Sequence, residues 1–328
     1  MRYLVSFGIM LGISFLVLGI GRYDISYADI FRSFWHLIGI KSDLDAQILY
    51  VILEVRLPRV ILGIFVGASL GIAGASFQSI FKNPLASPDI LGVSAGAGFG
   101  AALALLLGLN MYFLTLFAFV CGIITLILTF IVARDSSNRI MIILSGIIIS
   151  ALFQSLISLL KYIADPQDTL PTITYWLLGS LVVSDLWQLI FCCAGMSVGG
   201  IIIIIYRWKH NLLMLDDLEA KSLGLNIAKL RIILIFASTL MVSCVVSICG
   251  IIGWVGLIIP HIARIIAGSN TASVIPLSCF IGAIFMVIID TFARSASVEE
   301  IPISILSAII GAIFFVIILY RSKGNIKL

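Results

Sequence analysis

The sequence predicts an all-α integral membrane protein that crosses the bilayer about ten times as one transmembrane domain, residues 1–328. Hydrophobic residues make up 61% of the chain and charged residues only 11%, whereas a soluble domain carries about 25% charged residues. The mean hydropathy is +1.22, so lipid must cover part of the surface. Apolar runs recur at the length of a spanning helix, about 20 residues.

The apolar runs predict the individual spans. The first resembles a signal peptide, but its apolar core is too long and no A-x-A site follows, so we expect it to be retained. The run at 253–267 is the weakest because it is short and contains Pro260. Residues 171–181 are too few to cross and are expected to form a re-entrant or interfacial piece. The spans are expected at 3–21, 57–80, 91–108, 112–133, 140–163, 186–206, 229–250, 253–267, 272–292 and 303–320.

The distribution of Lys and Arg predicts the orientation. If the N-terminus is cytoplasmic, the inner loops and ends hold 13 of the 20 Lys and Arg residues and the outer loops hold 7. Cytoplasmic loops carry such an excess. We therefore expect a multi-pass protein of the cytoplasmic (inner) cell membrane with both termini in the cytoplasm. The net charge of +4 is then a membrane signature, with lipid rather than nucleic acid as the partner.

Two loops are long enough to hold structure of their own. The outer loop 22–55 is mildly acidic. The longest inner loop is 207–228, and its centre, about 208–226, is rich in helix formers and reaches Gly224, a suitable helix C-cap. We expect one or two short helices beneath the membrane there. Such a helix is a possible binding site for a soluble motor subunit. The acidic and basic residues of the segment are equally ordinary for a solvent-exposed helix.

Small residues are spaced for close helix packing. Glycines recur every four residues at Gly63, Gly67 and Gly71, and again from Gly92 to Gly100. In lipid such stripes let backbones approach closely, so we interpret them as packing surfaces. The six cysteines lie in or beside apolar runs without CxxC or zinc spacing, and we expect small buried hydrophobes rather than disulfides.

Two segments break the pattern of a lipid-facing helix. Arg56-Leu57-Pro58-Arg59 brings two guanidinium groups to the outer end of the second span. They either snorkel at the interface or form a rigid basic patch for an acidic partner. Between Gln78 and Gly100, two prolines and many small residues form a turn. Irregular backbone at membrane depth must be buried in protein or line a watery cavity, which indicates a translocation path.

The polar residues disfavour other classes of membrane protein. His36, His210 and His261 lie on separate segments, so the sequence offers no metal centre or nucleophile–base cluster for an intramembrane enzyme. A GxxxxGK[ST] motif is lacking, so this chain cannot hydrolyse ATP itself. An ion-coupled secondary transporter remains the main rival. It needs buried carboxylates, and the deepest, Asp290, can pair with Arg294.

Five motifs together resemble the FecCD/BtuC-like permease family, the membrane subunits of type II ATP-binding-cassette (ABC) importers for iron–siderophore complexes, haem and cobalamin. The resemblance covers essentially the whole chain, in order and at family spacing. Ser304 stands where the family more often has glycine. The motifs are Arg56-Leu57-Pro58-Arg59, Asn83 to Ala97, Glu219-Ala220 with Leu223-Gly224, Gly253 to Arg264, and Glu300-Ile301-Pro302-Ile303.

The resemblance implies a ten-helix subunit that dimerises with itself, binds two ABC ATPase subunits and receives cargo from one extracytoplasmic substrate-binding protein. It implies no catalytic residue, metal or cofactor in this chain, since ATP and Mg²⁺ belong to the ATPase. A ferric siderophore is the leading cargo, with haem and cobalamin open. The implied site residues are Arg56, Arg59 and Arg294 for docking of the binding protein, Glu219, Ala220, Leu223 and Gly224 for coupling to the ATPase, and Asn83, Leu85, Ser136 and Ser137 for the inner gate.

Overall fold

The computed structural model describes residues 2–37, 39, 44–134 and 138–321, and every regular element in these ranges is helical. Ten of its helices match the ten predicted spans in order. Among the described residues, seven helices are long and apolar enough to cross a membrane, and the shorter apolar helices are α5, α13 and the stretch Ile303–Ile318 of α15. The matching helices are α1 (Arg2–Gly19), α4 (Leu57–Ile80), α5 (Val93–Leu106), α6 (Met111–Ala133), α7 (Arg139–Ile163), α9 (Leu186–Ile205), α12 (Ile227–Cys249), α13 (Val255–Ala267), α14 (Thr271–Ser295) and α15 (Ile303–Arg321).

The second span begins earlier than the sequence predicts. α3 (Ala46–Tyr50) and a π-helix, η1 (Val51–Arg56), continue directly into α4. Asp45 caps this helix by accepting a hydrogen bond from the Gln47 backbone N–H. η1 ends two residues before Pro58, so this proline lies inside one continuous helical run rather than at its start. The expected outer loop 22–55 is therefore largely helical, with α2 (Tyr27–Leu37) in its first half.

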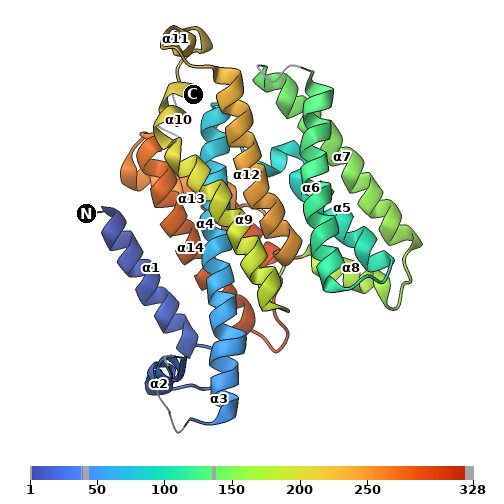
Figure 1. Cartoon of the computed structure of the whole chain (residues 1–328), viewed down its shortest axis with the longest axis vertical. Coiled ribbons are helices and arrows are strands. Elements are labelled where there is room, and N and C mark those ends of the chain that lie inside the picture. The colour runs from blue at the N-terminus through green and yellow to red at the C-terminus, as the bar shows by residue number, and fades with distance from the viewer. Residues whose placement is uncertain (1, 38, 40–43, 135–137, 322–328) are drawn as a thin grey trace.

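Short helices mark the two ends of the molecule. α8 (Thr169–Leu177) is too short to cross, as predicted, and the expected inner helices are α10 (Arg207–Leu213) and α11 (Asp217–Ser222). α11 lies at the opposite end from α2 and α3 (Figure 1). At the end that contains α2, backbone N–H groups of Ile303 and Ser304 donate to carbonyls just after α8. α15 thus starts at that end and runs toward the end that contains α11.

α4 runs through the centre of the molecule and packs along α14 (Figure 1). A Cβ atom added to Gly67 would lie 2.0 Å from the Gly282 carbonyl oxygen, and one on Gly282 would lie 2.1 Å from the Gly67 oxygen. The two backbones touch here with no room for any side chain. On α5, Gly96 and Gly100 meet α6 just as closely. The predicted glycine stripes are confirmed as packing surfaces.

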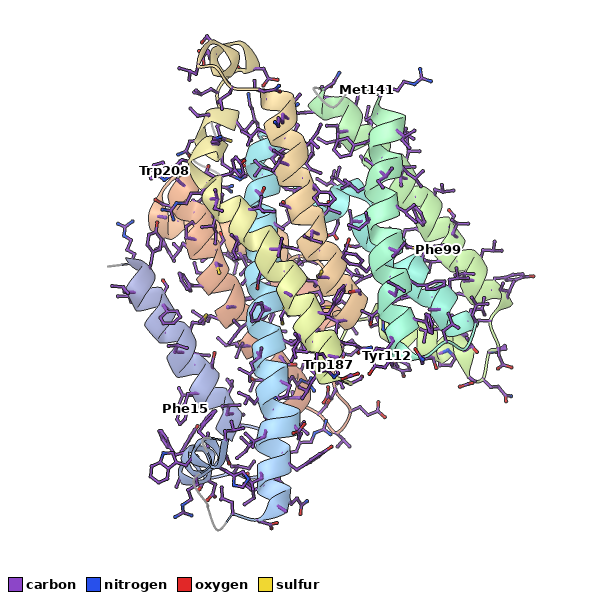
Figure 2. All side chains as sticks on the ribbon, viewed as in Figure 1. Phe15, Phe99, Tyr112, Met141, Trp187 and Trp208 are labelled. Carbon is purple, nitrogen blue, oxygen red and sulfur yellow. The ribbon has the colours of Figure 1, made fainter. Side chains whose placement is uncertain are left out.

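Exposed aromatic side chains lie toward both ends of the molecule. Trp208 lies near the α11 end, whereas Trp187 and Tyr112 lie toward the other end (Figure 2). Amphipathic aromatic rings favour the two membrane–water interfaces. Between these levels α6 and α7 expose Ile, Leu and Phe side chains. This apolar lateral surface of α6 and α7 suits the hydrocarbon core of a bilayer.

The backbone contact between α4 and α14 predicts that a side chain at Gly282 separates the pair. Gly282→Val should lower the free energy of unfolding by about 1–3 kcal/mol or more, because overpacking forces the helices apart. The check is the thermal unfolding midpoint in detergent, together with the amount of folded protein in membranes. Gly12→Val is the matched control because no atom lies within 4 Å of that position. Equal midpoints for the two variants would contradict the contact.

Candidate functional site

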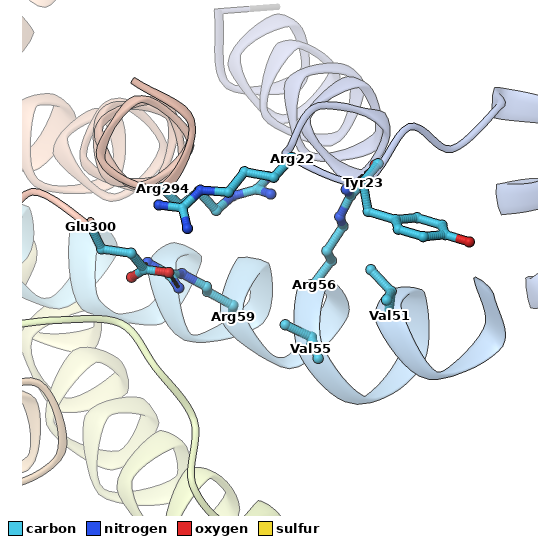
Figure 3. Close-up of a pocket in the computed structure, with 8 residues that line it drawn as sticks. All are labelled: Arg22, Tyr23, Val51, Val55, Arg56, Arg59, Arg294 and Glu300. Atoms are coloured by element: carbon cyan, nitrogen blue, oxygen red, sulfur yellow. Dashed lines mark hydrogen bonds and ion pairs between the residues drawn. The ribbon is translucent and has the colours of Figure 1, made fainter. Parts of the chain in front are cut away.

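Four arginines gather around a cavity of about 180 Å³ near the α2 end of the molecule, and Glu300 faces the same cavity (Figure 3). We call Arg22, Arg56, Arg59 and Arg294 the outer arginine cluster. Arg56 ends η1, Arg59 lies in the first turn of α4, and Arg294 lies in the last turn of α14. The cluster therefore forms where the second and ninth spans meet, as the positions of three of its members predict.

Arg59 links α4 to α14 and to the segment that follows α14. Its Nε lies 2.8 Å from Asp290 Oδ1, and its Nη1 and Nη2 lie 2.9 and 2.8 Å from the two Glu300 carboxylate oxygens. Arg59 and Asp290 are 6% and 3% exposed. Burial alone raises the pKa of Glu300, but the hydrogen bonds and charge of Arg59 outweigh burial and lower it. This is a fully paired ionic network.

Arg56 and Arg294 hold the end of α1. Arg56 Nη1 donates to the Leu18 carbonyl at 2.6 Å and its Nη2 donates to the Tyr23 carbonyl at 2.5 Å. Arg294 Nη2 donates to the Val17 carbonyl at 2.7 Å. The last carbonyls of a helix lack partners within the helix and carry partial negative charge, so cations suit them. Arg294 also lies 3.8 Å from Asp290, the pairing expected from their spacing.

The structure brings Arg56, Arg59 and Arg294 together but buries them, at 4%, 6% and 9% exposure. Snorkelling to the membrane surface therefore does not describe them, because their guanidinium groups are bonded to carbonyl and carboxylate groups of the chain itself. Their role in docking a binding protein stays a prediction. Sequence reasoning missed Arg22 and the pairing of Arg59 with Glu300. The sequence did contain a hint of this pairing, because Glu300 follows Arg294 by six residues in the segment expected on the outer side.

At the opposite end, α10 is bonded to both α4 and α14. Ser79 Oγ lies 2.6 Å from His210 Nδ1, and burial lowers the pKa of His210 to about 3, so the ring is neutral. The Asn211 amide donates to Asn270 Oδ1 at 2.9 Å and accepts from the Thr271 backbone N–H at 2.9 Å. We call these contacts the inner joint. α10 is therefore tied directly to the neighbouring ends of α4 and α14.

α11 presents the predicted coupling residues. Glu219, Leu223 and Gly224 are exposed, while Ala220 is buried at 1%. Gly224 has φ +79° and ends α11 in the left-handed conformation, which confirms it as the C-cap. Asp217 ties α11 to the membrane helices through Lys82, Arg139 and Arg231 at 3.6–3.7 Å.

The predicted gate residues divide into two groups. Asn83 and Leu85 lie in the exposed turn after α4, where Asn83 Oδ1 accepts a hydrogen bond from the Leu85 backbone N–H at 2.9 Å. Ser136 and Ser137 lie outside the described residues. A role of this turn as a gate remains a prediction.

Asp290 bears on the ion-coupled rival. The sequence predicts Asp290 as the acidic residue deepest in the membrane, and its carboxylate forms ion pairs with Arg59 and Arg294. A carboxylate held in this way offers little coordination capacity to a transported cation.

Comparison with known proteins gives a consistent assignment. The model of the FecCD transport family matches residues 9–321. The molybdate import permease MolB of Haemophilus influenzae is 41% identical over 308 residues, which cover 93% of this chain and 91% of MolB. An iron chelatin transport permease of Helicobacter pylori is 36% identical over 275 residues, 84% of this chain and 83% of that protein.

A solved structure supports the same fold. An inward-facing metal-chelate type ABC transporter matches with a TM-score of 0.88 and 39% identity, over 98% of this chain and 99% of that one. The structure of PsaBC from Streptococcus pneumoniae, at 22% identity and a TM-score of 0.59, shares the fold. Together with the ten matching spans, these similarities confirm the predicted permease fold.

Breaking the buried pair of Arg59 and Asp290 should destabilise the protein itself. Arg59→Leu leaves the Asp290 carboxylate buried beside a single, more distant cation, which costs about 3–5 kcal/mol of folding free energy. The double variant Arg59→Leu/Asp290→Leu should recover much of this loss. Arg32→Leu, which removes an exposed pair with Asp29, should change stability by less than about 1 kcal/mol. Unfolding midpoints measured in detergent test the order. A normal midpoint for Arg59→Leu alone would contradict the structural role.

Proposed function

Because this chain belongs to the FecCD transport family, we propose that it is the permease subunit of an ABC importer for metal-chelate cargo. One observation carries the proposal: the family match spans nearly the whole chain and includes the exposed coupling motif on α11. The chain is a multi-pass membrane protein without catalysis of its own. Residues 1–328 act as one permease domain, and residues 208–226 form its cytoplasmic coupling segment. Both termini lie in the cytoplasm.

Energy enters through a separate motor. Two ABC ATPase subunits bind ATP with Mg²⁺ and grip Glu219, Leu223 and Gly224, while the buried Ala220 anchors α11 against the permease. Movement of α11 passes to α10, and the inner joint transfers it to α4 and α14. Two copies of the chain form a homodimer around a central path. The turn with Asn83 and Leu85 then opens as the outer side closes, which is alternating access.

The outer end receives cargo from an extracytoplasmic substrate-binding protein. Arg56, Arg59 and Arg294 support this surface from below, because they fix α1, η1 and the segment of Glu300 around the cavity. Glu300 keeps 41% of its side chain exposed. The acidic residues of the binding protein approach the cluster on the side where Arg22 lines the cavity. A homodimer repeats the surface, so each lobe of the partner meets one copy.

A ferric siderophore or related iron chelate is the proposed cargo. The similarity to an iron chelatin permease favours it. Molybdate is the second candidate, favoured by the 41% identity to a molybdate permease. A haem transporter of Yersinia pestis is 30% identical, so haem also remains a candidate.

Uptake into proteoliposomes tests the function and the cargo together. The permease is reconstituted with its ATPase, and the cognate binding protein is added with radiolabelled ferric chelate or molybdate. We expect uptake of one cargo that requires ATP and the binding protein. Uptake driven by a proton or sodium gradient without ATP would overturn the proposal in favour of the ion-coupled rival.

The coupling segment makes a sharper prediction at Gly224. Gly224→Trp forces a bulky side chain into the left-handed conformation, at a cost of about 1–2 kcal/mol, and occupies the surface offered to the ATPase. We expect uptake to fall roughly tenfold or more and ATPase association to weaken, with normal amounts of protein in the membrane.

Gly224→Asn is the matched control, since Asn tolerates the left-handed conformation and no atom lies within 4 Å of the position. This variant should keep most of the uptake. Equal uptake by Gly224→Trp and wild type would count against α11 as the ATPase seat.

A further inference from the structure

A second polar cavity lies at the inner end, next to the inner joint. Its volume is about 260 Å³. We call it the inner pocket, and α4, the turn after it, α13 and the start of α14 supply most of its walls. Its lining residues are Gln78, Lys82, Asn83, Pro84, Met214, His261, Arg264, Ser269 and Thr271.

Two polar side chains of the inner pocket have buried atoms without partners. Gln78 is 1% exposed and its Oε1 accepts no hydrogen bond, while its Nε2 reaches the Leu257 carbonyl only at 3.5 Å. Arg264 Nη1 is buried and donates no hydrogen bond. A buried donor of a charged group costs several kcal/mol when it is left unpaired, so such an atom indicates a missing ligand.

The charges of the inner pocket are one-sided. Lys82 and Arg264 are cations, and no carboxylate lines the pocket among the described residues. The nearest acidic groups belong to α10–α11: Asp217 and Asp216 lie 3.7 and 4.0 Å from Lys82 Nζ, which also donates to the Leu215 carbonyl at 2.5 Å. These contacts offset part of the Lys82 charge and leave the Arg264 guanidinium uncompensated.

We propose that the inner pocket binds a tetrahedral oxyanion, such as a phosphate group, with Arg264 as its main ligand. A guanidinium fork matches two oxygens of such an anion. Lys82 adds a second charge, and the Gln78 carbonyl oxygen accepts a hydrogen bond from a hydroxyl of the protonated anion or from its bound water. The source is either a free anion of the cytoplasm or the headgroup of an anionic lipid.

The position of the inner pocket means that a bound anion would connect helices that move during transport. Its ligands come from α4 and α13, and Thr271 belongs to both the pocket and the inner joint. A bound anion therefore bridges helices that the coupling segment moves. It favours the arrangement in which Arg264, Lys82 and Gln78 converge, so occupancy would shift the balance between permease conformations.

The test measures thermal unfolding of the full-length chain in detergent without phospholipid. Inorganic phosphate and molybdate are titrated against chloride at equal ionic strength. We expect the two oxyanions to raise the unfolding midpoint of the wild type, because a ligand that binds only the folded state stabilises it. Arg264→Met should weaken the apparent affinity roughly tenfold or more. Gln78→Leu should weaken it less, since it removes a neutral group.

In the absence of oxyanion, Arg264→Met is expected not to lower the unfolding midpoint. The variant removes an unpaired charge and fills the space with an apolar side chain, so its midpoint in oxyanion-free buffer should equal or exceed that of the wild type. This crossing pattern separates loss of a ligand from loss of folding. Lys229→Met is the matched control: Lys229 is exposed on α12 and does not line the pocket, so its oxyanion response should be that of the wild type.

A second arm identifies the source of the anion. Nanodiscs of phosphatidylcholine are compared with nanodiscs that contain phosphatidylglycerol. Stabilisation by phosphatidylglycerol that Arg264→Met removes assigns the site to a lipid headgroup, whereas stabilisation by phosphate or molybdate alone assigns it to a free anion. If neither source gives a response that depends on Arg264, the proposal is overturned. The readout involves no uptake, so its failure is distinct from failure of the importer function.

Discussion

The direct backbone contact between α4 and α14 is the constraint on which the structure depends. In lipid, apolar side chains gain nothing by leaving lipid for protein, so helices associate through close packing and polar contacts. Gly67 and Gly282 provide that packing, since each leaves no room for a Cβ atom on the other. α4 is consequently the central helix, and α9, α12 and α13 pack around it. In the apolar window of the helix Ala46–Ile80, 78% of the residues are buried, against 17% in α1 at the edge.

Polar contacts fasten the same helix pair at both ends. At the outer end, Arg59 bridges Asp290 and Glu300, and at the inner end α10 is bonded to Ser79 and Asn270. Arg59, Asp290, Ser79 and His210 are the buried members of these networks, and Asn270 is exposed. At the buried positions an unpaired charge or polar group would be costly. α4 and α14 thus form one connected unit between the outer arginine cluster and the α10–α11 segment. This geometry suits long-range coupling across a membrane.

The inner pocket differs from the outer arginine cluster in how its cations are paired. The outer arginines all have protein partners, whereas Arg264 and Gln78 keep buried atoms without any. Both cavities are lined by more cations than carboxylates, but the cations have different partners. At the outer end the guanidinium groups bind carbonyl and carboxylate groups of the chain itself. At the inner end the unpaired Arg264 Nη1 donor favours an external anion.

The sequence by itself determined the ten spans, the presence of one or two short helices within 207–228 and the glycine stripes, because each follows from local hydropathy, composition or spacing. It also located the end of α11, since Gly224 marks a helix end through its own backbone preference. Only the tertiary structure decided that Arg59 pairs with Asp290 and Glu300, more than 230 residues away, and that α4 continues outward through a π-turn to Ala46. An arginine at a membrane edge looks the same in sequence whether it snorkels or is buried. Its state depends on partners that distant segments bring to it.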